Sequence, residues 1–220
     1  MISAIAGFLA GTLHVFAGPD HLAAIAPLAV DGRSRAWKTG LRWGLGHAAG
    51  VIVVGFLSLM LRDLLPLKNI SDWSERLVGV LLIAIGLWGI RKAMQVHSHE
   101  HEHAGERHVH LHIHSASQPH QDLSAHTHGH TAFGIGTIHG LAGSSHFFGV
   151  LPTLAFPRAT EGIIYLVAFG LGTIAAMLFF STAISKIAGR MTKRNVKGYR
   201  NAMCCCSFAT LLIGGYWLFV

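Results

Sequence analysis

The chain has 220 residues, of which 51% are hydrophobic and 12% are charged, whereas a soluble domain carries about 25% charged residues. Its mean hydropathy is +0.47 although one stretch is very polar, so the other segments are apolar enough for a bilayer. This composition excludes a soluble globule, a collagen, a disordered chain and a disulfide scaffold. We therefore expect an all-α integral membrane protein, and we expect no cleaved secretory signal in its first apolar run.

Six apolar segments predict six transmembrane helices at about 2–30, 39–61, 74–91, 132–156, 160–185 and 201–220. Thirteen of the 17 Lys and Arg residues lie in or beside the connections that fall on one side of the membrane. Basic residues mark the cytoplasmic side. We therefore expect a cytoplasmic-membrane protein with both termini outside and its middle loop in the cytoplasm. The positive charge then reports orientation in a lipid bilayer and does not indicate a nucleic-acid partner.

The sequence contains an internal repeat. Residues 11–21, GTLHVFAGPDH, match residues 136–146, GTIHGLAGSSH, at an offset of 125. Gly44-Leu-Gly46 matches Gly170-Leu-Gly172 at an offset of 126, and residues 86–88 resemble residues 215–217. Three helices used twice must cross the membrane in opposite senses. The sequence therefore predicts two inverted three-helix repeats, residues 1–92 and 132–220, with a separate segment at 93–131.

The middle segment is rich in histidine, with imidazoles at every second position over several stretches. Dense histidine tracts bind transition metals such as zinc, nickel, copper and cobalt. Because the composition is of low complexity, we expect a disordered cytoplasmic loop that collects or buffers metal. Its accessory metal-binding residues are His97, His99, His101, His103, His108, His110, His112, His114, His126, His128 and His130.

A second group of ionisable residues lies within the apolar spans. A lone membrane histidine usually hydrogen-bonds to a neighbouring helix, but six such groups, four of them matched by the repeat, favour an ion pathway. We place the principal site in the first half, with the two histidines of the second half completing it or forming a second station. The predicted metal ligands are His14, Asp20, His21, His47, His139 and His146.

His14 and His21 are seven residues apart, so an unbroken helix would separate them by about 10.5 Å along its axis. Gly18-Pro19 lies between them, and a proline inside a helix removes a hydrogen bond and breaks or kinks it. We therefore expect a broken helix that brings Asp20 and His21 toward His14. Neutral imidazoles with one carboxylate suit Ni²⁺, Co²⁺ or Zn²⁺ better than Mg²⁺ or Ca²⁺.

The run from His14 to His21, HVFAGPDH, followed by Gly44-Leu-Gly-His47, resembles the signature of the nickel/cobalt transporter family. Six helices with a histidine-rich loop are similar to its short urease-accessory-like and nickel/cobalt exporter-like branch. The resemblance implies transport of nickel or cobalt through a site that contains His14, Asp20, His21 and His47. Import and export both remain open.

We interpret the chain as a secondary transporter of divalent Ni²⁺ or Co²⁺, with the metal as substrate and no prosthetic cofactor. It contains no G-x-x-x-x-G-K-[ST] nucleotide-binding motif, so we expect coupling to a proton gradient. We expect no enzyme activity, since none of the predicted helices carries an H-E-x-x-H motif. The alternative is a membrane-anchored metal sensor or store that acts through the histidine-rich loop. We interpret the consecutive Cys204, Cys205 and Cys206 as packing residues.

Overall fold

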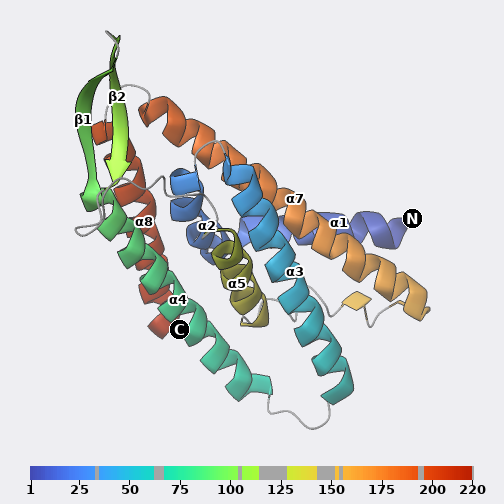
Figure 1. Ribbon diagram of the computed structural model, residues 1–220. Helices are drawn as coiled ribbons and strands as arrows, with labels where there is room; N and C mark the ends of the chain where they lie inside the picture. Colours follow the sequence, from blue (N-terminus) through green and yellow to red (C-terminus); the bar gives the residue numbers. More distant parts are fainter. Residues whose placement is uncertain are drawn as a thin grey trace.

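The computed structural model describes residues 1–32, 35–61, 67–103, 106–113, 128–142, 152–153, 156–192 and 196–219. Over these ranges the chain forms seven helices and one two-stranded sheet (Figure 1). The helices are α1 (Ile2–Ala17), α2 (Pro19–Gly32), α3 (Ala36–Leu61), α4 (Leu67–Gln95), α5 (His128–Leu141), α7 (Ala159–Thr192) and α8 (Val196–Phe219).

The first apolar segment consists of two helices. α1 ends at Ala17, α2 begins at Pro19, and the two axes differ by 74°. Proline has no N–H and keeps the residue before it extended, and Gly18 between the helices is extended at φ −89° and ψ 99°. The N–H of Gly18 still donates to the carbonyl of His14 at 3.1 Å. The predicted break at Gly18-Pro19 is thus confirmed.

A second proline, Pro27, lies inside α2. A proline cannot donate to the carbonyl four residues before it, which here belongs to Ala23. The hydroxyl of Thr210 on α8 lies 2.9 Å from that carbonyl and 2.8 Å from the carbonyl of Cys206 on its own helix, and it has one proton for the two. α8 thus offers a donor to the carbonyl that Pro27 cannot reach, and this contact joins α2 to α8.

Several of these helices can cross a membrane. The stretches Glu75–Gln95 in α4, Ala159–Met191 in α7 and Lys197–Phe219 in α8 are each long and apolar enough, and α1 and α2 pass the same test together. Large apolar side chains such as Leu13, Phe179 and Leu212 are exposed on the outside of the bundle. Since a bilayer covers such a surface, the chain is an integral membrane protein.

Helices from the two halves of the sequence pack against each other. α1 packs on α7, α5 packs on α3, α3 also contacts α7, and α4 packs on α8. Gly11 of α1 lies against the backbone carbonyl of Phe169 on α7, and Gly136 of α5 lies against that of Trp43 on α3, so closely that an added Cβ would collide with the oxygen. The absence of a side chain at these two glycines allows the helices to approach.

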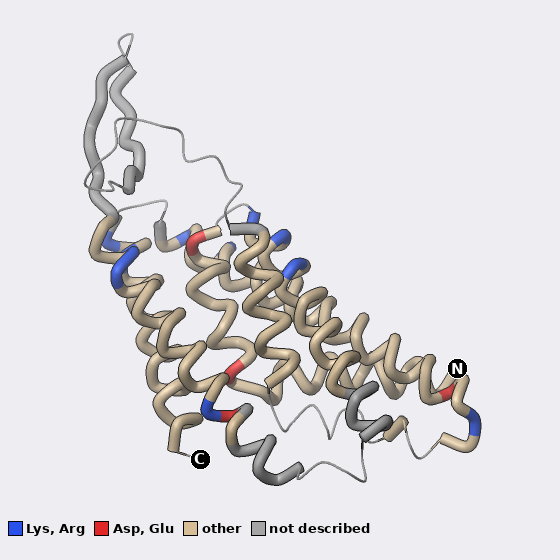
Figure 2. The backbone as a smooth tube through the Cα atoms, turned by 60° about the horizontal axis from the view of Figure 1, so that its bottom comes forward, with Lys and Arg blue, Asp and Glu red and all other residues tan. Residues whose placement is uncertain are grey.

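Basic residues gather at one end of the bundle, whereas at the other end they lie beside acidic ones (Figure 2). Near the basic end, Asp31 in the last turn of α2 accepts hydrogen bonds from Lys92 of α4 at 2.5 Å and from the hydroxyl of Tyr199 of α8 at 3.1 Å. At the opposite end, Arg158 lies 3.8 Å from Glu161. α2 is therefore fixed to two neighbouring helices at the end remote from Pro19.

Strands β1 (Val96–His103) and β2 (Glu106–Ile113) pair antiparallel, with His97 opposite His112 and His103 opposite Glu106. Both strands lie within residues 93–131, for which the sequence predicted a disordered loop. Their histidines recur at every second residue, and such alternation is typical of β-strands. The register also pairs His99 with His110 and His101 with His108.

Candidate metal centre

The break in the first span brings three predicted ligands together. His14 lies in the last turn of α1, and Asp20 and His21 lie in the first turn of α2. The ring centroids of His14 and His21 are 4.5 Å apart, less than half of the separation on a straight helix. The bend between α1 and α2 thus turns a sequence spacing of seven residues into a direct contact.

Two further histidines come from other helices. His47 on α3 lies with its ring centroid 4.9 Å from that of His21 and 5.8 Å from that of His14. His139 on α5 lies 4.8 Å from His21 and 5.8 Å from His47. His21, His47 and His139 are fully buried, and Asp20 is 6% exposed. We call these five residues, His14, Asp20, His21, His47 and His139, the His/Asp cluster.

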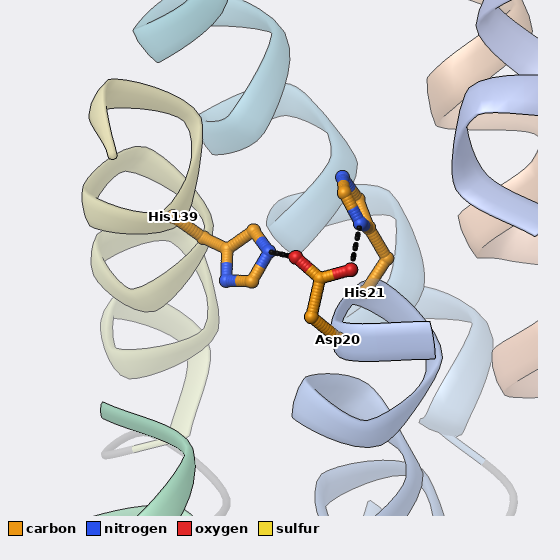
Figure 3. A network of polar contacts seen from close by, with 3 residues as sticks. All are labelled: Asp20, His21 and His139. Atoms are coloured by element: carbon orange, nitrogen blue, oxygen red, sulfur yellow. Dashed lines mark hydrogen bonds and ion pairs between the residues drawn. The ribbon is translucent and has the colours of Figure 1, made fainter. Parts of the chain in front are cut away.

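The carboxylate of Asp20 connects two of the rings (Figure 3). Its Oδ1 atom lies 3.0 Å from Nδ1 of His21, and its Oδ2 atom lies 3.1 Å from Nε2 of His139. An ionised carboxylate can only accept, so each ring donates from the nitrogen that faces it. The lone pair of a neutral ring then lies on the other nitrogen, which is Nε2 of His21 and Nδ1 of His139.

The cluster contains two overlapping groups of metal-ligand geometry. His14, His21 and His47 form one, Asp20, His21 and His139 form the other, and the ligand atoms within each group lie within 4.8 Å of one another. Donor atoms about 2.1 Å from a tetrahedral ion stand about 3.4 Å apart, so a bound ion would draw the ligand atoms of either group closer together. His21 belongs to both groups and is the centre of the arrangement.

Two aromatic side chains line the cluster. The indole of Trp43 stacks on the ring of His47 at 4.9 Å with an interplanar angle of 13°, and the ring of Phe169 lies 5.5 Å from that of His14. Sequence reasoning missed both residues. The repeat carried the signal, because each stands directly before a matched Gly-Leu-Gly, at an offset of 126.

The other predicted ligands do not join the cluster in the part of the chain that the structure describes. His146, His114 and His126 lie outside the described residues, and His128 begins α5, where its side chain is not described. His130 on α5 is exposed. Thr173 occupies the repeat position of His47 and donates to the carbonyl of Phe169 at 3.0 Å. The described cluster thus draws four residues from the first half and one, His139, from the second.

The donor set has a definite chemistry. Four imidazoles and one carboxylate lie inside an apolar bundle, and this mixture of nitrogen with one oxygen ligand suits borderline divalent ions such as Ni²⁺, Co²⁺ and Zn²⁺. The oxygen-rich shells that Mg²⁺ and Ca²⁺ require are absent among the described cluster residues. The cysteines on α8 are free, and Cys205 is exposed on the outside of the bundle, so they do not belong to this centre.

Comparison with known proteins places the chain in a family. The model of the family described as the cytochrome c biogenesis protein transmembrane region matches residues 3–216. The chain belongs to this family. This member of the cytochrome c biogenesis transmembrane family is 34% identical over 196 residues to the Chloroplast protein FOR GROWTH AND FERTILITY 1 of Arabidopsis thaliana. That alignment covers 88% of this chain and 52% of the relative, so the chain spans about half the length of that protein.

Two further relatives carry names that refer to urease or to metals. The urease accessory protein UreH of Bacillus sp. (strain TB-90) is 29% identical over 221 residues, which cover 97% of this chain and 89% of UreH. The "Putative nickel/cobalt efflux system" of Methanocaldococcus jannaschii is 29% identical over 101 residues, 44% of this chain and 47% of that protein. The resemblance to the urease-accessory-like branch is thereby confirmed. No solved structure matches the chain.

Proposed function

We propose that the chain is a secondary transporter that moves Ni²⁺ or Co²⁺ across the cytoplasmic membrane through the His/Asp cluster. The observation that carries the proposal is the cluster itself, in which α2, α3 and α5 supply three buried imidazoles and a buried carboxylate and α1 adds the partly buried His14. Ionisable groups are expensive at that depth and mark ion pathways. The nickel/cobalt efflux relative supports this class of cargo, and Zn²⁺ is a third ion that the same ligands accept.

In this proposal the ion binds first among His14, His21 and His47, while Asp20 acts on it through His21. A carboxylate that accepts from one nitrogen of an imidazole fixes the ring and makes the other nitrogen a better ligand. The contact between Asp20 and Nδ1 of His21 has this geometry. The group of Asp20, His21 and His139 provides a neighbouring position for the same ion once the protons on the two ring nitrogens that face Asp20 have moved away, and His21 serves both groups.

The architecture in this proposal has six spans arranged as two inverted three-helix repeats. It is supported by the exchange of partners between the halves, since α1 packs on α7 while its repeat equivalent α5 packs on α3, the equivalent of α7. The gathering of Lys and Arg at one end of the bundle supports an orientation with that end in the cytoplasm (Figure 2). In this proposal the histidine-rich loop lies on the same side. Both termini then lie outside.

The energy source in this proposal is the proton gradient. Imidazole must lose its proton to bind a metal, so protons and metal ions compete for the cluster. The same ligands serve import and export, because direction depends on the coupling gradient and not on the donor set. The direction is therefore read from the metal content of cells.

The test is the flux of Ni²⁺ and Co²⁺ into proteoliposomes that contain the full chain. His139→Ala removes a buried cluster residue, and Ile138→Ala shortens an exposed side chain on the same helix, α5. We expect His139→Ala to reduce flux at least tenfold and Ile138→Ala to leave it unchanged. Equal flux in both variants, with both inserted at equal levels, would overturn the assignment of the cluster.

A further inference from the structure

Trp43 and Phe169 hold the same place in the two halves of the chain. Trp43-Gly-Leu-Gly-His47 matches Phe169-Gly-Leu-Gly-Thr173 at an offset of 126. Trp43 is fully buried on α3 and Phe169 is 2% exposed on α7. Both halves of the chain therefore place a buried aromatic residue beside the proposed ion ligands. Neither residue can bind a metal ion, so its position requires another explanation.

The backbone at each of these residues is fixed in the same way. A glycine of the opposite half, Gly136 at Trp43 and Gly11 at Phe169, lies directly against the carbonyl oxygen of the aromatic residue. These two glycines are themselves related by the repeat offset of 125. Because the backbone is held so closely, the part that can move without separating the helices is the aromatic side chain.

Each ring covers a different part of the His/Asp cluster. Trp43 stacks on His47, and its ring centroid also lies 5.9 Å from that of His21 and 5.3 Å from that of His139. Phe169 contacts the cluster at His14, at 5.5 Å. The two aromatic residues therefore flank the histidines from different directions.

These directions correspond to the two ends of the bundle. α3 and α7 run in opposite directions (Figure 1). Trp43 precedes His47 by four residues and Phe169 precedes Thr173 by four, so each lies about 6 Å nearer the start of its own helix. α3 starts at the end where Lys and Arg gather, and α7 starts at the other end (Figure 2). One ring is thus displaced toward each end.

We propose that Trp43 and Phe169 are the two gates of the ion site, Trp43 closing it toward the basic end of the bundle and Phe169 closing it toward the opposite end. This inference rests on the proposed transport function. A bulky apolar ring excludes a hydrated ion, and alternating access requires that one such barrier opens while the other stays closed. The repeat supplies one barrier from each half.

The side chain of Trp43 is suited to such a movement. Its Nε1 atom is buried and has no hydrogen-bond partner among the residues that the structure describes, although a buried indole N–H usually finds one. A rotation of the ring away from His47 therefore breaks stacking contacts and no hydrogen bond. Phe169 has no hydrogen-bonding atom in its side chain, so the same holds for it.

The test uses a reporter cysteine at the position that matches His47 in the repeat. Thr173 is fully buried at the repeat position of His47, and Thr173→Cys is introduced into a full-length chain whose three native cysteines are changed to alanine. A membrane-impermeant methanethiosulfonate is then added from either side, to intact cells or to inverted vesicles. Reference cysteines at Arg35, near the basic end, and at Arg158, at the other end, establish which side reaches which end.

We expect the reporter to be protected in the parent and to be labelled at least tenfold faster after removal of one gate. Trp43→Ala should admit the reagent only from the side that labels Arg35→Cys, and Phe169→Ala only from the side that labels Arg158→Cys. Trp37→Ala on α3 and Phe179→Ala on α7 remove the same residue types from exposed positions, and they should leave the reporter protected.

Leucine variants at the two gates repeat the test with a smaller loss of volume, so the result does not depend on the stability of one alanine variant. Trp43→Phe retains a ring and should keep the reporter protected. Labelling of both gate variants from the same side, or of neither, would overturn the proposal. Because the thiol reaction requires no metal flux, this outcome is distinguishable from a failure of the transport function itself.

Discussion

The Nε2 atom of His139 lies 3.1 Å from the Oδ2 atom of Asp20, although the two residues are 119 positions apart in the chain. Asp20 belongs to the first half of the sequence and His139 to the second. The contact is fully buried, so it depends on the packing of α5 within the first half of the chain. The His/Asp cluster therefore draws residues from both halves of the sequence, and the proposed alternating access between two repeats would use such a shared site.

Asp20→Asn should weaken Ni²⁺ binding about 10- to 100-fold, because an amide cannot accept from both imidazoles at once and such supporting contacts contribute this much to metal affinity. The measurement is a calorimetric titration of the purified full chain. Asp31→Asn changes the other aspartate of α2, which contacts Lys92 and Tyr199 and no cluster residue, and it should leave the affinity unchanged. Equal affinities in the two variants would contradict the role of Asp20.

Gly136→Ala should lower the thermal stability of the chain in detergent, because its Cβ would collide with the backbone carbonyl of Trp43 and overpacking costs about 1–3 kcal/mol. Gly134 lies on the same helix with nothing within 4 Å of an added Cβ. Gly134→Ala should therefore leave stability unchanged or raise it slightly, since alanine is the better helix former. The prediction fails if both variants melt at the same temperature.

The hairpin register predicts how its histidines share metal ions. Opposite positions of an antiparallel pair lie about 5 Å apart, and we predict that each of the register pairs His97–His112, His99–His110 and His101–His108 binds one ion. Changing His97 and His112 to alanine removes one such pair, whereas changing His97 and His108 breaks two. The first variant should lose one equivalent of bound Ni²⁺ and the second should lose two, as measured by elemental analysis after dialysis. Equal losses would indicate binding without regard to register.

Deletion of residues 97–130 separates transport from sensing or storage. A transporter whose ion site is the His/Asp cluster should keep its flux, with altered affinity or regulation, because none of the cluster residues lies in the deleted segment. A sensor or store that acts through the histidine-rich segment should lose its activity completely. The measurement is Ni²⁺ flux in proteoliposomes, and complete loss in a correctly inserted deletion variant would favour the alternative.

The sequence alone predicted the features that depend on local chemistry. The break between His14 and His21 follows from Pro19, and the apolar helices follow from hydropathy. The contact between Asp20 and His139 was predicted only as one of two arrangements, because it depends on how α5 packs on α3. Asp31 was not expected to join Lys92 and Tyr199, since three helices far apart in sequence make that contact. The hairpin was not predicted, because the low-complexity composition indicated disorder although histidines at every second position are typical of a strand.

The most direct measurement of the central claim is the nickel, cobalt and zinc content of cells by elemental mass spectrometry. Cells that express the chain are compared with cells that express His14→Ala at equal membrane levels. Transport through the His/Asp cluster predicts a difference in one of these metals, with a higher content in the unaltered chain indicating import and a lower content indicating export. Equal contents of all three metals would contradict transport of these ions through the cluster.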